Sequence, residues 1–140
     1  MAVFKAEEGI LAIGTSVLEG NATVTDTLYI GNNNFEFNTN AIAVPTSANV
    51  VIDAYPGAQY KFAKYFVTVR NAANTLFHAQ ELIVVNQGNN AYLTSYGQVF
   101  NNYELANFDV NIVSGSVQIV AIPTANAVPL TVSTYRTIQA

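Results

Sequence analysis

The stretch Tyr60–Arg70, YKFAKYFVTVR, alternates between two sets of side chains. Successive side chains of a β-strand point to opposite faces of a sheet, so this period of two predicts a strand. An amphipathic helix would instead place apolar residues three and four positions apart. One face of the predicted strand holds the odd-numbered residues Lys61, Ala63, Tyr65, Val67 and Val69.

Short runs of the same kind recur along the rest of the chain, with turn signals between them. Tyr55-Pro-Gly57 and Ser114-Gly-Ser116 are typical of tight turns, and Gly97 interrupts a strand in the way that a β-bulge does. We therefore predict an all-β fold, an antiparallel β-sandwich or jelly-roll-like domain over residues 41–140. Its further strands are expected at 50–52, 76–85, 92–100, 108–113, 117–122 and 128–138.

Residues 1–40 have a different character, because glycines interrupt their strand-like runs and large apolar side chains are few. Thr23, Thr25 and Thr27 alternate with their neighbours, and Phe35–Asn38 alternates after a run of asparagines. An isolated hairpin is marginally stable in water. We therefore expect an N-terminal arm or hairpin used for docking or oligomerisation, and expect deletion of residues 1–38 to abolish assembly while the sandwich still folds.

Charged residues make up only 10% of the 140 residues, against about 25% in a typical soluble domain. Forty-two residues are Asn, Thr, Ser or Gln, and 40 are Val, Ile or Thr, which favours sheets. So neutral a surface favours association with other subunits. A net charge of −4 argues against nucleic-acid binding, and the lack of cysteine excludes disulfides and thiolate sites.

Targeting and membrane segments are not expected. The apolar run Gly9–Gly14 is too short for the core of a signal peptide. The uncharged stretch from Val110 to Tyr135 contains Pro123, Pro129 and many polar residues, which disfavours a membrane helix. A small outer-membrane barrel is disfavoured because neither a signal peptide nor aromatic girdles are evident.

Catalytic chemistry has few candidates. His78, the sole histidine, could be a general base or a metal ligand, but we interpret it as an ordinary strand residue at the sheet surface or an interface. No nucleophile elbow, calcium loop or phosphate loop is found. We predict no catalytic, cofactor or metal residues and no enzymatic activity. A small glycan hydrolase is the alternative, with carboxylates drawn from Asp53, Glu81, Glu104 and Asp109.

Glu81 is more simply interpreted as one half of a structural ion pair. Its partner is expected among Lys61, Lys64, Arg70 and Arg136. Tyr92, Tyr96 and Tyr103 lie close together in sequence and could contact sugars or protein partners, but cross-strand packing is the favoured interpretation.

Residues 55–138 resemble a C-terminal β-domain of virion structural proteins from tailed bacteriophages, notably myoviruses of marine cyanobacteria. The resemblance rests on the spacing of strands and turns, not on a catalytic signature. It is carried by 64–70, 81–85, 90–92, Tyr96-Gly97, 105–112, 115–119 and 121–125. It implies a head-surface, tail or fibre-like protein with no cofactor and no catalytic residues.

These observations favour a non-enzymatic capsid decoration or cement protein that binds and stabilises the assembled head. The expected partners are further copies of the chain, with a homotrimer as the guess, and the major capsid protein or another virion protein. The alternative is a tail or tail-fibre component that contacts host-surface glycans. We expect location in the virion, on the capsid surface first and on the tail as the alternative.

Overall fold

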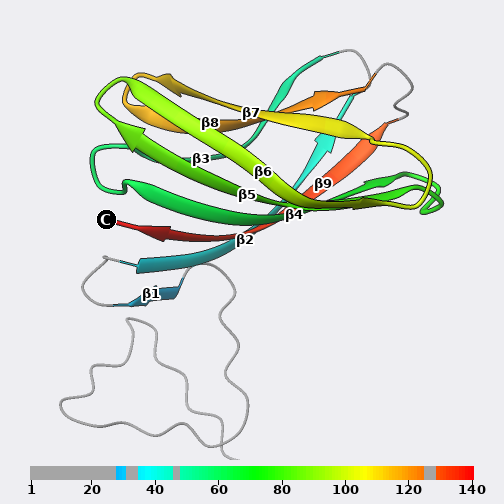
Figure 1. Cartoon of the computed structure of the whole chain (residues 1–140), viewed down its shortest axis with the longest axis horizontal. Helices are drawn as coiled ribbons and strands as arrows, with labels where there is room; N and C mark the ends of the chain where they lie inside the picture. The colour runs from blue at the N-terminus through cyan, green and yellow to red at the C-terminus, as the bar shows by residue number, and fades with distance from the viewer. Residues whose placement is uncertain (1–27, 31–34, 46–47, 125–128) are drawn as a thin grey trace, which may run out of the picture.

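Alternating strands separated by Asn- and Gly-rich turns build two sheets in the computed structural model (Figure 1), which describes residues 28–30, 35–45, 48–124 and 129–140. The six-stranded sheet has the order β1-β2-β9-β4-β5-β6, and the three-stranded sheet has the order β3-β8-β7. All paired strands are antiparallel, which confirms the predicted antiparallel β-sandwich. Their bounds are β1 Leu28–Ile30, β2 Phe35–Val44, β3 Val50–Pro56, β4 Phe62–Asn71, β5 Phe77–Gln87, β6 Asn90–Phe100, β7 Ala106–Val113, β8 Ser116–Pro123 and β9 Leu130–Gln139.

The core lies between the two sheets and follows the predicted alternation. In β4, the side chains of Ala63, Tyr65, Val67 and Val69 are buried, while their neighbours on the other face are exposed. Leu82, Ile119 and Val132 add fully buried apolar side chains from β5, β8 and β9. Each buried side chain of this kind contributes about 1.5–3 kcal/mol of transfer free energy.

Strand β5 buries an unexpected set of residues. Phe77, Ala79, Glu81, Ile83 and Val85 share a face, as its alternation indicates, but this face points away from the core. The inward face instead carries Leu82 and Val84 together with three polar side chains, His78, Gln80 and Asn86. Asn86 is hydrogen bonded: its Nδ2 donates to the Gly57 carbonyl at 2.9 Å and its Oδ1 accepts from the Tyr55 hydroxyl at 3.4 Å.

Two predicted turn features are present. Ser114 and Gly115 have positive φ angles of 51° and 80°, the combination that a two-residue hairpin turn of type I′ requires. Gly97 has a φ of 64°, and the pairing of β5 with β6 shifts by one residue between Ala79 and Glu81, opposite this glycine. Gly97 therefore forms the predicted bulge.

Strand β2 crosses residue 40, the predicted boundary between arm and sandwich. It pairs with β9 along its whole length, from Phe35↔Gln139 to Val44↔Leu130. Truncation at residue 38 would thus remove the first part of a strand that lies inside the six-stranded sheet. Residues 1–27 and 31–34 of the predicted arm fall outside the described residues, and the division into 1–40 and 41–140 stays a prediction.

Candidate functional site

The six-stranded sheet presents a broad face on the side opposite the core, which we call the outer face. Six aromatic side chains of β4, β5, β6 and β9 lie on it, each at least 40% exposed: Phe62, Phe66, Phe77, Tyr92, Tyr96 and Tyr135. A monomeric soluble protein rarely exposes large contiguous apolar patches unless they contact something. The outer face is therefore the part of the described surface whose composition calls for a functional explanation.

A groove of about 540 Å³ lies on the outer face, across β2, β9 and β4. The strand register builds it in rows. Thr39, Tyr135 and Phe66 lie side by side in one row, and Ala41, Ser133 and Thr68 lie side by side in the next. The residues that line the groove are Thr39, Asn40, Ala41, Phe66, Thr68, Ser133, Thr134 and Tyr135.

The groove combines two aromatic rings with short hydroxyl side chains and has no charged residue in its lining. Directly opposed residues of antiparallel strands have Cβ atoms about 5 Å apart, so the side chains of Phe66 and Tyr135 are neighbours on the outer face. We call this pair the aromatic platform. Each Ser or Thr hydroxyl offers one donor and two acceptor positions. The arrangement suits a ligand with apolar C–H faces and many hydroxyl groups.

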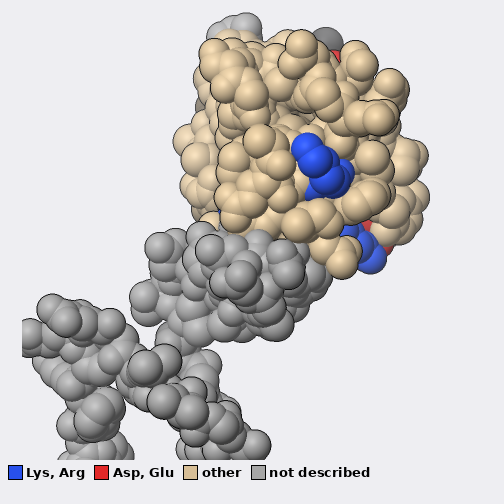
Figure 2. All heavy atoms as spheres, turned by 90° about the vertical axis from the view of Figure 1, so that its left-hand side faces the viewer, with Lys and Arg blue, Asp and Glu red and all other residues tan. Residues whose placement is uncertain are grey.

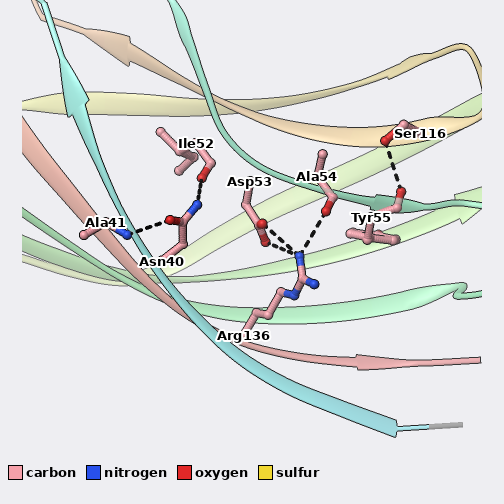
Figure 3. Close-up of polar contacts among 8 residues, drawn as sticks. All are labelled: Asn40, Ala41, Ile52, Asp53, Ala54, Tyr55, Ser116 and Arg136. Carbon is pink, nitrogen blue, oxygen red and sulfur yellow. Dashed lines mark hydrogen bonds and ion pairs between the residues drawn. The ribbon is translucent and has the colours of Figure 1, made fainter. Parts of the chain in front are cut away.

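Asn40 helps to hold the first strand of the groove in place. Its Nδ2 donates to the Ile52 carbonyl of β3 at 2.9 Å, and its Oδ1 accepts from the Ala41 backbone N–H at 2.9 Å (Figure 3). The side chain of Asn40 thereby ties β2 to the small sheet. Thr39, its neighbour, remains exposed in the groove.

An ion pair flanks the groove on the β5 side. The Lys64 Nζ lies 3.1 Å from a Glu81 carboxylate oxygen and 5.9 Å from the centre of the Tyr96 ring. Hydrogen bonds from Tyr96 and Lys64 lower the pKa of Glu81. Hydrogen bonds with Glu81 and Tyr96 raise the pKa of Lys64. This confirms the predicted pairing of Glu81 with one of the few cations, and it identifies that cation as Lys64.

Two further hollows adjoin the same strands. One of about 170 Å³ continues along β4 and β9 past Lys64 and is lined by Phe62, Ala63, Lys64, Ile83, Thr137 and Gln139. The other, of about 340 Å³, lies at the opposite end of β4 and is largely apolar. It is lined by Thr68, Val69, Arg70, Phe77, His78, Ala79, Val99, Phe100 and Asn101.

Asp53, one of the four carboxylate candidates, is partly buried, with 11% of its side chain exposed. Its two oxygens accept hydrogen bonds from the Arg136 Nη1 at 2.8 and 2.7 Å, and the same nitrogen donates to the Ala54 carbonyl at 3.0 Å (Figure 3). This pair joins β9 of the large sheet to β3 of the small sheet. Arg136 directly follows Tyr135, whose side chain lines the groove on the opposite face of β9. The Asp53–Arg136 pair therefore helps to fix the part of β9 that carries Tyr135.

The other three carboxylates lie on separate elements. Glu81 is on β5 beside Lys64, Glu104 accepts a hydrogen bond from Gln98 in the segment before β7, and Asp109 is exposed on β7. The structure thus pairs each of Asp53 and Glu81 with a cation and does not place the four candidates in one row of the sheet. Among the described residues, no group of three His, Asp or Glu side chains could hold a metal ion.

His78 is not at the sheet surface or an interface, as was expected, but 2% exposed on the core side of β5. Side chains alternate along β5, and those of Phe77 and Ala79 point outward. The side chain of His78, between them, therefore points inward. Its Nε2 lies 3.2 Å from the Gln98 amide, and its ring meets Phe100 edge-to-face with 6.1 Å between centroids. Burial lowers the pKa of His78, with Glu104 and Gln80 opposing the change.

The three tyrosines singled out from sequence separate in space. Tyr92 and Tyr96 are 64% and 40% exposed on the outer face, whereas Tyr103 is partly buried against the core. Phe66 and Tyr135 were not predicted as site residues. The sequence indicates only that each residue is on the outward face of an alternating strand. The pairing of β4 with β9 brings the two residues together although they are almost 70 positions apart.

Figure 2 shows one end of the molecule, where uncharged residues cover most of the visible described surface. No helix among the described residues is long and apolar enough to cross a membrane.

No protein-family model and no curated protein matches the chain in sequence. The solved structures that resemble it include three phage tailspikes. The tailspike of Acinetobacter baumannii phage AM24 has a TM-score of 0.49 at 9% identity, over 76% of this chain and 26% of that one. The tailspike of Acinetobacter baumannii bacteriophage Fri1, described as a capsular polysaccharide depolymerase, gives 0.47 at 15%, over 82% and 19%. That of Acinetobacter phage vB_ApiP_P1 gives 0.41 at 15%, over 90% and 26%.

The chain therefore spans about a quarter of the length of these tailspikes or less, and the likeness concerns the fold alone. It gives no support to the cyanophage-like family, to capsid decoration or to a place on the head.

The prediction that the protein is not an enzyme is contradicted by one of the similar structures, which is described as a capsular polysaccharide depolymerase. That description belongs to the tailspike, of which this chain covers 19% at 15% identity. That prediction rested on the lack of a local catalytic motif. Catalytic groups are recognised by their geometry, and they can come from segments far apart in sequence. A search for local motifs is therefore a poor guide to this kind of activity.

Proposed function

We propose that the protein is a tail or fibre-type component of a phage virion and that its groove on the outer face binds surface glycan. The observation that carries the proposal is the pairing of Phe66 with Tyr135 in a groove whose other outward side chains are the Ala41 methyl group and three hydroxyl-bearing residues, Thr39, Thr68 and Ser133. The virion setting is supported by the sequence resemblance, and the location on the tail is part of the proposal.

The chemistry of the groove matches that of a sugar ring. One face of a pyranose is lined by C–H groups, which pack on the electron-rich faces of aromatic rings. The hydroxyl groups at the ring edge need partners that both donate and accept hydrogen bonds, and Thr39, Thr68 and Ser133 supply such groups beside the platform.

The shape of the groove favours the interior of a polymer over a small molecule. It runs over three adjacent strands on an open sheet face, so a chain could enter at one end and leave at the other. Strand positions are rigid, which limits the entropy lost on binding. A single shallow site of this kind is expected to bind with a Kd on the order of 0.1–1 mM, and several copies on one particle would raise the effective affinity through avidity.

A glycan array probed with the purified chain tests the binding part of the proposal. Binding to polysaccharide fragments, lost when Phe66 or Tyr135 is replaced by alanine, is the expected result. Immunogold labelling of virions tests the location, with label expected at the tail. Binding that survives both substitutions would remove the groove from the proposal, and label confined to the head would remove the tail assignment.

A further inference from the structure

We propose that the Lys64–Glu81 ion pair sets the charge class of the glycan, so that the groove accepts neutral sugars and discriminates against acidic ones. This inference rests on the proposed function and adds to it the class of polysaccharide.

The pair lies where a bound polymer would pass. Glu81 is directly opposite Phe66 across the β4–β5 ladder, so it borders the aromatic platform on the side away from Tyr135. Lys64 is two residues from Phe66 along β4, about 7 Å away. Lys64 also lines the hollow of about 170 Å³ that lies farther along β4 and β9. A polymer that crosses β2, β9 and β4 in the groove and extends towards β5 meets Glu81 and the Lys64 ammonium group beside it.

Lys64 lies beside this path, and its charge is balanced by that of Glu81. Its ammonium group lies 3.1 Å from Glu81 and 5.9 Å from the centre of the Tyr96 ring. Arg70, the other outward cation on β4, lies past Thr68 at the opposite end of the strand, where its Nη1 donates to the Asn74 side chain at 3.0 Å. The groove lining itself holds no charged residue.

A sugar carboxylate would therefore find a poor environment. To reach Lys64 it would have to compete with the Glu81 carboxylate and lie beside it, and two like charges at short distance repel each other. The net charge of −4 adds a general repulsion of polyanions. A neutral hexose meets neither penalty, because the rings and hydroxyls that would hold it are uncharged.

Changing the pair without touching the platform tests this inference. Glu81→Gln removes the negative charge and leaves Lys64 free to meet a carboxylate. The matched control is the double variant Lys64→Gln with Glu81→Gln, which is also uncharged at Glu81 but has no cation to offer. Both residues are at the surface, and a thermal melt checks that each variant remains folded.

The probe is an array that carries neutral hexose oligosaccharides beside uronate-containing counterparts of equal length. The chain is expected to bind neutral members and not the uronates. Glu81→Gln should gain uronate binding several-fold at low ionic strength, with the gain falling as salt is added, and the double variant should not gain it. Binding of the neutral oligosaccharides by each variant serves as the reference against which its uronate binding is compared.

Two outcomes overturn the inference in different ways. If the unaltered chain binds uronates as well as neutral sugars, or if Glu81→Gln gains no uronate binding, the proposed discrimination by the Lys64–Glu81 pair is wrong. Glycan binding by the groove would still stand. If the chain binds no glycan, or binds it independently of Phe66 and Tyr135, the proposed function is wrong. The proposed discrimination against acidic sugars is then wrong as well.

Discussion

Replacing Asp53 by alanine leaves the Arg136 guanidinium without its carboxylate in a buried position. The two side chains are 11% and 10% exposed, and three short hydrogen bonds hold the Arg136 Nη1. The substitution removes two of those three bonds and leaves the one to the Ala54 carbonyl. Breaking a buried ion pair by removing one partner costs about 3–5 kcal/mol, a large part of a total stability of about 5–15 kcal/mol.

Urea denaturation, followed by circular dichroism and analysed by linear extrapolation, measures this loss. Asp53→Ala should lower the free energy of unfolding by about 3–5 kcal/mol. The double variant Asp53→Ala with Arg136→Met should lose less than this, because no charge is left buried. Lys64→Ala, which breaks the exposed pair, should shift the midpoint little. An Asp53→Ala chain no less stable than Lys64→Ala would refute the reasoning that this pair joins the two sheets.

Two further changes probe the core. Burial lowers the pKa of His78 below its usual 6.5, so the unfolded chain binds a proton first and stability should fall as the pH drops below about 6.5. His78→Gln should flatten this dependence in urea titrations between pH 7 and 5, and an unchanged slope would contradict it. A Cβ added at Gly57 would lie 3.0 Å from Val117 Cγ2 and 3.1 Å from Asn86 Nδ2. Gly57→Ala should therefore cost about 1–3 kcal/mol by thermal or urea unfolding, and a neutral result would show that this corner of the core can relax.

Local pattern was enough to predict strands β3 to β9 and several turns, but not β2, which crosses the predicted boundary at residue 40. The period of two places β4 and β9 correctly, and the flexibility of glycine explains the bulge at Gly97 and the hairpin at Gly115. These features depend on neighbouring residues, whose preferences can be assessed from the sequence directly.

The inward face of β5 could not be predicted in this way. Both faces of the strand contain apolar residues, and the outward one, with Phe77, Ile83 and Val85, is the more apolar of the two. Hydrophobicity alone would have buried that face. The inward polar residues are accommodated by partners from distant segments, as Asn86 is by Tyr55 and Gly57.

The candidate site depends on pairings between distant strands. Asp53 and Arg136 are 83 positions apart, and the groove exists only because β9 lies between β2 and β4. Neither Phe66 nor Tyr135 belongs to a sequence motif. His78 and the acidic residues were the candidates because their side chains can carry catalytic chemistry. Only Glu81, with its cation, was assigned a role that the structure confirms, the structural ion pair.

The binding isotherm of a matched pair of variants tests the central claim most directly. Phe66 and Phe77 lie on the same outer face and are 46% and 49% exposed, but only Phe66 lines the groove. With a neutral oligosaccharide that binds on the array, calorimetric titration should show a Kd roughly fivefold weaker for Phe66→Ala, which corresponds to about 1 kcal/mol of lost aromatic contact. Phe77→Ala should bind like the unaltered chain. Equal losses in the two variants, or no loss in Phe66→Ala, would contradict the assignment of the groove as the glycan site.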